Sequence, residues 1–266
     1  MLIIGERINS SRKRIAPAIE AKDADFILNE AGIQIDSGAD YIDVNAGTFG
    51  PEREPELLSW LVKTIQNKYG CRLSLDSPNP AAIEPALKLH NGKALINSIS
   101  LETRRYDALM PLVRDYGTDV IAMCADDEGM PTQLDKKLLL AARLVEKLTG
   151  QGIPLGNIYL DPLVHPIATD HTYGKIVLAA INRIMSDFPG VHTIIGLSNV
   201  SYGLPFRFQL NQIFLVLAMG SGLDSAILDP TDKRLMANIT TAKALLGLDE
   251  YCMKYIEAHQ TGKLEL

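Results

Sequence analysis

The alternation of short apolar runs with longer stretches of helical periodicity constrains the fold of this sequence more than any other feature. The longer stretches are predicted helices, for example at residues 54–69, 134–149, 173–188 and 209–219. The apolar runs are predicted strands, at residues 2–5, 41–45, 72–76, 94–98, 120–124, 158–161, 193–199 and 226–229. Eight strand–helix units in about 250 residues are typical of a closed (β/α)8 barrel, the TIM barrel.

An open, doubly wound parallel sheet is the alternative α/β fold for such a pattern. Runs such as LIIG and TIIGL are apolar throughout, as expected for parallel strands that are covered on both faces. The nucleotide-binding motifs GxGxxG and GxxxxGK[ST], which accompany many open sheets, follow none of the predicted strands. We therefore predict an α/β protein with one (β/α)8 barrel domain over residues 1–266, which a helix after Gly247 closes.

The composition argues against several classes of function. The chain of 266 residues has a net charge of −6, whereas proteins that bind nucleic acid usually present a basic face. It has no apolar run near the roughly 20 residues that span a bilayer, and we expect neither a membrane segment nor a signal peptide. The three cysteines form no CxxC motif or Cys/His cluster, so we expect no bound metal and a reducing, cytoplasmic location.

Polar side chains end four of the predicted strands, in the motifs LDS, INS, LDP and LSN. These motifs place Asp76, Asn97, Asp161 and Asn199 where the active sites of TIM barrels lie. A carboxylate can accept hydrogen bonds from the adjacent ring N–H and amine of a 2-amino-4-oxopyrimidine, and a carboxamide both donates and accepts. Each aspartate could instead cap the helix that follows it. Their recurrence at several strand ends favours a pterin site.

Other polar residues have two possible roles each. Asn199 has no acidic proton, but it can stabilise charge on a ring nitrogen through a preorganised hydrogen bond; the alternative is an Asn in a turn. Arg207 could bind an acidic ligand or partner, or form a surface ion pair of little energy. Glu6 and Arg7 could pair with each other or support the site from below. The acidic loop 126–128 lacks calcium-loop spacing, and we expect it to be solvated.

Several motifs, in the same order and with similar spacing, resemble those of the methyltetrahydrofolate:corrinoid methyltransferases. They are MLIIGERIN, LDS, ALINS, YLDPL, GLSNVS and GLDSAI, and the resemblance runs from Met1 to near residue 250. This family consists of pterin-binding TIM barrels related to the folate domain of cobalamin-dependent methionine synthase. The resemblance implies a homodimer that moves a methyl group between N5 of tetrahydrofolate and the cobalt of a corrinoid protein, in acetogenesis or anaerobic demethylation.

The resemblance also implies roles for individual residues. The implied substrate-binding residues are Asp76, Asn97, Asp161, Ser198, Asn199 and Arg207. Among them, Asn199 corresponds to the catalytic residue near N5. A departure occurs at Tyr202, where acetogenic members carry a glutamine that contacts the ligand, and the segment as far as Phe206 also differs. The corrinoid is carried by the partner protein, so the resemblance implies tetrahydrofolate or 5-methyltetrahydrofolate as the substrate and no metal site in this chain.

Two alternatives remain open at this point. Dihydropteroate synthase is also a pterin-binding barrel, but its first-strand block resembles NVTPDSF and a later block ends in STRPG. The present chain has GERINSS and VNAGTFGPEREP in those places. The second alternative, from a different functional class, is a non-catalytic subunit that binds folate or docks the corrinoid protein. An assay of p-aminobenzoate condensation tests the first alternative.

Overall fold

The computed structural model of the protein describes residues 1–264, in which eight parallel strands close into a barrel. The strands are β1 (Leu2–Asn9), β2 (Tyr41–Asn45), β3 (Arg72–Asp76), β4 (Leu95–Leu101), β5 (Asp119–Asp126), β6 (Ile158–Asp161), β7 (His192–Gly196) and β8 (Ser225–Leu228). Each strand pairs with the next along the chain, and β8 pairs with β1. The closed order of the strands confirms the predicted (β/α)8 barrel and contradicts the open sheet.

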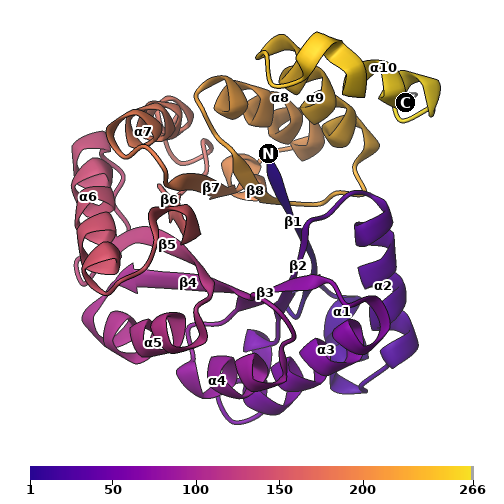
Figure 1. Cartoon of the computed structure of the whole chain (residues 1–266), viewed down its shortest axis with the longest axis vertical. Coiled ribbons are helices and arrows are strands. Elements are labelled where there is room, and N and C mark those ends of the chain that lie inside the picture. The colour runs from indigo at the N-terminus through magenta and orange to yellow at the C-terminus, as the bar shows by residue number, and fades with distance from the viewer. Residues whose placement is uncertain (265–266) are drawn as a thin grey trace.

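Helices surround the strands as an outer layer (Figure 1). The α-helices are α1 (Ile15–Glu20), α2 (Ala24–Asp36), α3 (Glu54–Tyr69), α4 (Pro80–Leu89), α5 (Thr103–Tyr116), α6 (Leu134–Gly150), α7 (Tyr173–Asp187), α8 (Arg207–Gly220), α9 (Lys233–Leu245) and α10 (Met253–Gln260). The 3₁₀ segments are η1 (Gly47–Phe49), η2 (Leu155–Asn157), η3 (Leu197–Ser201) and η4 (Glu250–Cys252). The predicted closing helix is α10, which packs against α9. Within residues 1–264, no helix has the length and apolarity needed to cross a membrane.

Helix α3 illustrates how the sequence pattern produces this outer layer. Its apolar side chains at positions 57, 58, 61, 62 and 65 recur at helical spacing and are all buried. Glu54 and Glu56 lie in the first turn, where negative charge stabilises the positive end of the helix dipole. Gly70 then ends the helix in the left-handed conformation, with φ of 59°. The helix has the predicted bounds.

Apolar side chains fill the barrel interior near the amino-terminal ends of the strands. This interior layer contains one residue from each of six strands: Ile4, Tyr41, Leu95, Ile121, Tyr159 and Ile194. The hydroxyl of Tyr41 donates a hydrogen bond to Asp119 Oδ2 at 3.0 Å, so the polar atom that enters this layer has a partner. The interior layer closes one end of the barrel, and the polar side chains at the carboxyl ends of the strands lie at the opposite, open end.

The predicted strand at 193–199 is wrong in its second half. Strand β7 ends at Gly196, and residues 197–201 form η3 instead. Leu197 and Val200 are both buried, and their spacing of three residues matches the period of a 3₁₀ helix rather than that of a strand. Asn199 consequently lies on a short helix after the strand. Strands β1 and β4 also extend beyond their predicted ends at residues 5 and 98.

Candidate active site

A cavity of about 320 Å³ opens at the carboxyl ends of the strands. It is lined by Glu6, Asn9, Ser11, Arg12, Asp43, Asp76, Asn97, Gly196, Ser198, Asn199 and Ile227. We call it the central cavity. Four of the six predicted substrate-binding residues, Asp76, Asn97, Ser198 and Asn199, meet in its wall. They come from β3, β4 and η3, so the closed barrel brings together positions that lie more than a hundred residues apart in the sequence.

A hydrogen-bonded group of carboxylates and amides forms one wall of the central cavity. Asp76 and Asn97 are neighbours in the register of β3 and β4. Asn97 Nδ2 donates to Asp43 Oδ1 at 3.1 Å, and the Ser74 hydroxyl donates to the same oxygen at 2.6 Å. Asn45 Nδ2 donates to Asp76 Oδ2 at 3.0 Å. These contacts fix the orientation of both carboxyl groups before any ligand binds.

Burial of this wall favours the protonated state of its carboxyl groups. Burial raises the pKa of Asp76 to about 6, although hydrogen bonding from Asn45 and the nearby charge of Arg105 oppose the shift. Burial raises the pKa of Asp43 well above its ordinary value, and the neighbouring Asp76 raises it further. Protonation of the pair is therefore favoured relative to that of two solvated carboxyl groups. Such a pair can both accept hydrogen bonds from a ligand and donate one to it.

Asp43 is the most deeply buried of the cavity residues that the predicted set of site residues omits. It is 3% exposed, lines the central cavity and accepts two hydrogen bonds there. A signal was present in the run YIDVN, where a carboxylate interrupts an otherwise apolar strand that is buried on both faces. A buried carboxylate in such a strand is costly unless it has specific partners, and this cost is the reason to suspect a site.

The amide of Asn199 lies directly over Gly196, the last residue of β7. A Cβ atom on Gly196 would be only 3.1 Å from Asn199 Nδ2, so glycine leaves the space that the amide occupies. Asn199 is exposed, and its amide has a donor and an acceptor that a ligand in the central cavity can reach. The amide therefore has a defined place at the cavity wall, although the residue is on η3 rather than at the end of a strand.

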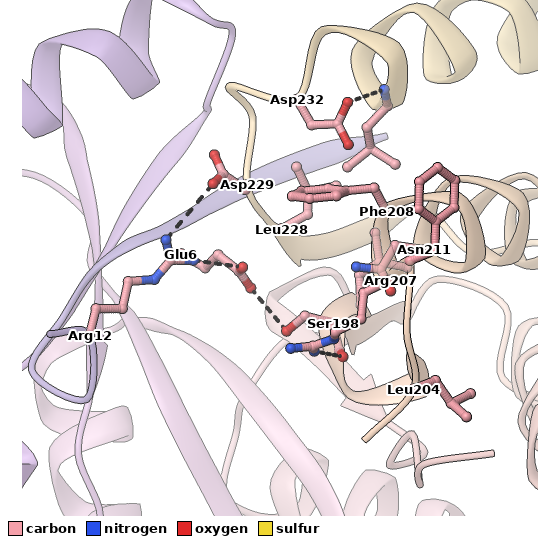
Figure 2. Close-up of a pocket in the computed structure, with 13 residues that line it drawn as sticks. Glu6, Arg12, Ser198, Leu204, Arg207, Phe208, Asn211, Leu228, Asp229 and Asp232 are labelled. Atoms are coloured by element: carbon pink, nitrogen blue, oxygen red, sulfur yellow. Dashed lines mark hydrogen bonds and ion pairs between the residues drawn. The ribbon is translucent and has the colours of Figure 1, made fainter. Parts of the chain in front are cut away.

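Glu6 connects the central cavity with a second one beside it. Figure 2 shows Glu6 between Arg12 and Ser198. Arg12 Nη2 donates to Glu6 Oε1 at 2.9 Å, and the Ser198 hydroxyl lies 3.5 Å from Glu6 Oε2. Burial raises the pKa of Glu6, and the charge of Arg12 opposes this shift. Arg7 points elsewhere, since its guanidinium contacts Glu30 at 2.8 Å, so the suggested Glu6–Arg7 pair is wrong.

The second cavity, of about 800 Å³, is lined by Glu6, Arg12, Leu197, Ser198, Leu204, Phe206, Arg207, Phe208, Asn211, Leu228, Asp229, Asp232 and Leu235. We call it the outer cavity. Arg207 in its wall donates through Nη2 to the Ser198 carbonyl at 2.6 Å (Figure 2). Its Nε also donates to the Ser201 hydroxyl at 3.0 Å. These hydrogen bonds connect η3 with the first residue of α8. They position Ser198 and the neighbouring Asn199.

Asp161 ends β6 at the same edge of the barrel, but among the described residues it lines neither of these cavities. Its Oδ1 accepts a hydrogen bond from the Leu163 backbone N–H at 2.8 Å, which gives a tight turn after the strand. Burial raises the pKa of Asp161 to about 6, opposed by the Leu163 N–H and the charge of Lys137. Its assignment to the substrate remains a prediction.

The acidic loop 126–128 is held by contacts with neighbouring side chains. Lys136 Nζ lies 2.9 Å from both Asp126 Oδ2 and Glu128 Oε2. Asp127 accepts hydrogen bonds from the backbone N–H and the hydroxyl of Thr103, at 3.0 and 2.6 Å. In the described part of the chain, no group of three or more histidine, cysteine, aspartate or glutamate side chains is arranged to hold a metal ion.

Comparison with known proteins gives the family of this barrel. A family model described as "Pterin binding enzyme" matches residues 5–229. The chain belongs to this family. It is 38% identical over 266 residues to the methylcorrinoid:tetrahydrofolate methyltransferase of Eubacterium limosum, a match that covers 99% of this chain and 98% of that protein. It is 30% identical over 262 residues to the methionine synthase of Mycobacterium tuberculosis, a match that covers 94% of this chain and 22% of that protein.

Solved structures similar to this pterin-binding family member include dihydropteroate synthases. The enzyme of Vibrio fischeri superposes with a TM-score of 0.71 at 16% identity, covering 92% of this chain and 93% of that chain. The enzyme of Thermus thermophilus superposes with a TM-score of 0.68 at 18% identity, covering 92% of this chain and 94% of that chain. At these identities the similarity concerns the fold alone.

Proposed function

We propose that this protein is a methyltransferase that moves a methyl group between N5 of tetrahydrofolate and the cobalt of a corrinoid protein, as part of one-carbon metabolism. The observation that carries the proposal is the central cavity, whose acceptors and amides fit a pterin. The full-length similarity to a methylcorrinoid:tetrahydrofolate methyltransferase supports the same substrates. The whole chain acts in this proposal as one pterin-binding barrel domain.

In this proposal, the pterin is bound through its amide-like edge. The ionised Asp76 accepts hydrogen bonds from the ring N–H and the exocyclic amine, and Asn97 both donates to and accepts from the ring. Asp161, at the end of β6, is the third binding residue. Ser198 and Arg207 contribute from η3 and α8, where Arg207 can meet the carboxylates of the folate tail in the outer cavity. The cavities leave the reacting face of the pterin accessible from the open end of the barrel.

Asn199 then acts on the reacting nitrogen. A tertiary amine is a poor leaving group, so transfer of the methyl group to cobalt(I) requires a proton on N5. The carbon–nitrogen bond breaks as the carbon–cobalt bond forms with the electron pair of cobalt(I), and N5 leaves with the proton. The Asn199 amide stabilises the positive charge by hydrogen bonding. Asp43, whose pKa burial and the neighbouring Asp76 raise, lies in the same cavity wall, and in this proposal it is a local source of the proton.

The corrinoid protein must dock over the open end of the barrel to bring cobalt to the methyl group. Three aromatic side chains beside the outer cavity, Tyr202, Phe206 and Phe208, are 66%, 80% and 69% exposed. We call them the aromatic rim. Exposed aromatic side chains at the edge of a polar site are typical of partner-binding surfaces, because they bury large apolar area at a low entropic cost. In this proposal the aromatic rim contacts the surface of the corrinoid protein that surrounds its bound corrinoid ring.

A matched pair of variants tests the aromatic rim. Phe206→Ser should raise the KM for the corrinoid protein by roughly tenfold, in line with removal of one interface aromatic side chain, and should weaken folate affinity by much less. Leu245→Ser is the control, because Leu245 is 81% exposed at the carboxyl-terminal end of α9. Equal KM values for the two variants would contradict the proposed docking surface.

The test of the main proposal is a stopped-flow experiment. Reduced corrinoid protein mixed with 5-methyltetrahydrofolate should lose its cobalt(I) absorbance only when this protein is present. If the protein binds folate by titration but leaves the cobalt spectrum unchanged, the non-catalytic folate-binding subunit is the better description. Formation of dihydropteroate from p-aminobenzoate would support the dihydropteroate synthase alternative, which the blocks GERINSS and VNAGTFGPEREP disfavour.

We further propose a cytoplasmic homodimer. Ile213 and Leu217 lie four residues apart on the outer face of α8 and are 51% and 53% exposed, which supports an interface between two copies there. The three free cysteines fit a reducing compartment. Sedimentation equilibrium should give a dimer for the protein and a monomer for Leu217→Asp, while an unchanged mass for the variant would place any interface elsewhere.

A further inference from the structure

Lys137 is a buried lysine that the proposed reaction does not use. It lies in the first turn of α6 and is only 1% exposed. Its ammonium donates to the Pro162 carbonyl at 2.6 Å and to the Leu163 carbonyl at 2.9 Å. A lysine is almost never fully buried unless its charge has partners. Its burial therefore requires an explanation in terms of the segment that it binds.

The segment that Lys137 binds is the turn that carries Asp161. Leu163 has a φ of 63°, a left-handed conformation that is costly for a side chain other than glycine and must be held by its surroundings. The Leu163 N–H donates to Asp161 Oδ1 at 2.8 Å, and the carbonyl of the same residue accepts from Lys137. The turn is thus bound from one side by the carboxylate and from the other by the ammonium.

The charge of Lys137 also acts on Asp161 directly. It lowers the pKa of the Asp161 carboxyl against the effect of burial, and the carboxylate in turn raises the pKa of Lys137, which burial lowers to about 8. Two other titratable groups face this pair. Burial raises the pKa of the Cys124 thiol and lowers the pKa of His165, so both are neutral between about pH 7 and pH 8. The charges of the cluster in this range are therefore those of Lys137 and Asp161.

We infer that Lys137 is a positioning residue for folate binding, which holds the Asp161 turn in its shape through two backbone carbonyls and supplies a positive charge to the Asp161 carboxylate. This inference rests on the proposed function, because it takes Asp161 as a folate contact. It adds a residue that lies outside both cavities and contacts no substrate. The lysine acts through two backbone carbonyls and through its charge.

The test is the pH dependence of folate affinity, measured by titration for the full-length protein. Lys137→Met should weaken tetrahydrofolate binding by about tenfold at pH 7, the change expected from the loss of charged hydrogen bonds. The loss should be larger at pH 6 than at pH 8, because the pKa of Asp161 rises when the positive charge is removed. A purely structural defect would weaken binding equally at each pH. If Lys137→Met does not fold, Lys137→Gln carries the same expectation.

Two further variants complete the design. Lys136→Met is the matched control, since Lys136 is the preceding residue in α6 and contacts Asp126 and Glu128 instead of the Asp161 turn; its folate affinity should equal that of the wild type. Lys137→Arg retains a charge that does not titrate near pH 8. The wild type should therefore lose affinity above about pH 8, and Lys137→Arg should not.

A double-mutant cycle with Asp161→Asn separates this inference from the proposed function. If Lys137 acts through Asp161, Lys137→Met should have little further effect on folate affinity in the Asp161→Asn background. Fully additive losses, or wild-type affinity for Lys137→Met at every pH, would overturn the inference while the folate assignment of Asp161 stands. Wild-type affinity for Asp161→Asn alone would overturn both.

Discussion

Gly196 offers a way to move the Asn199 amide without removing it. A Cβ atom on Gly196 would lie 3.1 Å from Asn199 Nδ2, whereas ordinary contacts of a Cβ atom fall between 3.4 and 4 Å. Gly196→Ala should therefore displace the amide by about 0.3 to 0.9 Å, the difference between these distances. The backbone φ of Gly196 is −78°, which alanine adopts without strain. A misplacement of 1 Å can cost about a hundredfold in rate, so the loss should be roughly fourfold to sixtyfold.

The assay for Gly196→Ala is the single-turnover rate of methyl transfer at saturating folate, together with folate affinity by titration. The rate should fall in the stated range, and the affinity should stay within about twofold, because the amide acts on charge that develops during the reaction. Gly220→Ala at the end of α8 is the control, since an added Cβ meets nothing within 4 Å there. A full rate for Gly196→Ala would refute the role of the amide's position, and so would an equal loss in both variants.

Three further substitutions have defined outcomes. Asn199→Ala should lower the methyl-transfer rate far more than folate affinity in the same two assays; equal losses would reduce Asn199 to a binding residue. Asp76→Asn should abolish folate binding and raise the free energy of unfolding at pH 7.5 by on the order of 1 to 3 kcal/mol, because a carboxyl whose pKa burial raises to about 6 destabilises the folded protein above that pH. This gain should vanish below pH 4 in thermal unfolding, and its persistence there would exclude titration as the cause. Asp161→Ala should weaken folate binding sharply, and an unchanged dissociation constant would reject its assignment.

The barrel was predictable from the sequence because each of its strands is a short apolar run beside a helical pattern. In α3 the apolar spacing and the terminal Gly70 are local signals, and the predicted bounds agree with the structure. The end of β7 was not predictable in the same way. In the run TIIGLSNVS apolar residues continue past Gly196, which a longer strand would also show, and the three-residue spacing of the buried Leu197 and Val200 distinguishes η3.

Two residues of the central cavity, Asp76 and Asn97, were predictable because each stands at the predicted end of an apolar run, although β4 continues past Asn97 to Leu101. Asp43 was harder to assign, since it lies before the end of β2 and its significance depends on contacts with residues from two other strands. Lys137 gave no signal, because a lysine at the start of a helix is normally a solvated side chain. Lys137 is buried because the chain after Asp161 passes over its side chain. This contact forms only in the folded barrel, so the residues next to Lys137 in the sequence do not indicate it.

The interior layer around Ile4, Tyr41 and Leu95 bears on the kinetics of the proposed reaction. With one end of the barrel filled, both substrates must use a single entrance. A docked macromolecule over that entrance would block exchange of the smaller substrate beneath it. The reaction should therefore follow a compulsory order, in which folate enters first and leaves last. Product inhibition should accordingly be competitive only between tetrahydrofolate and 5-methyltetrahydrofolate.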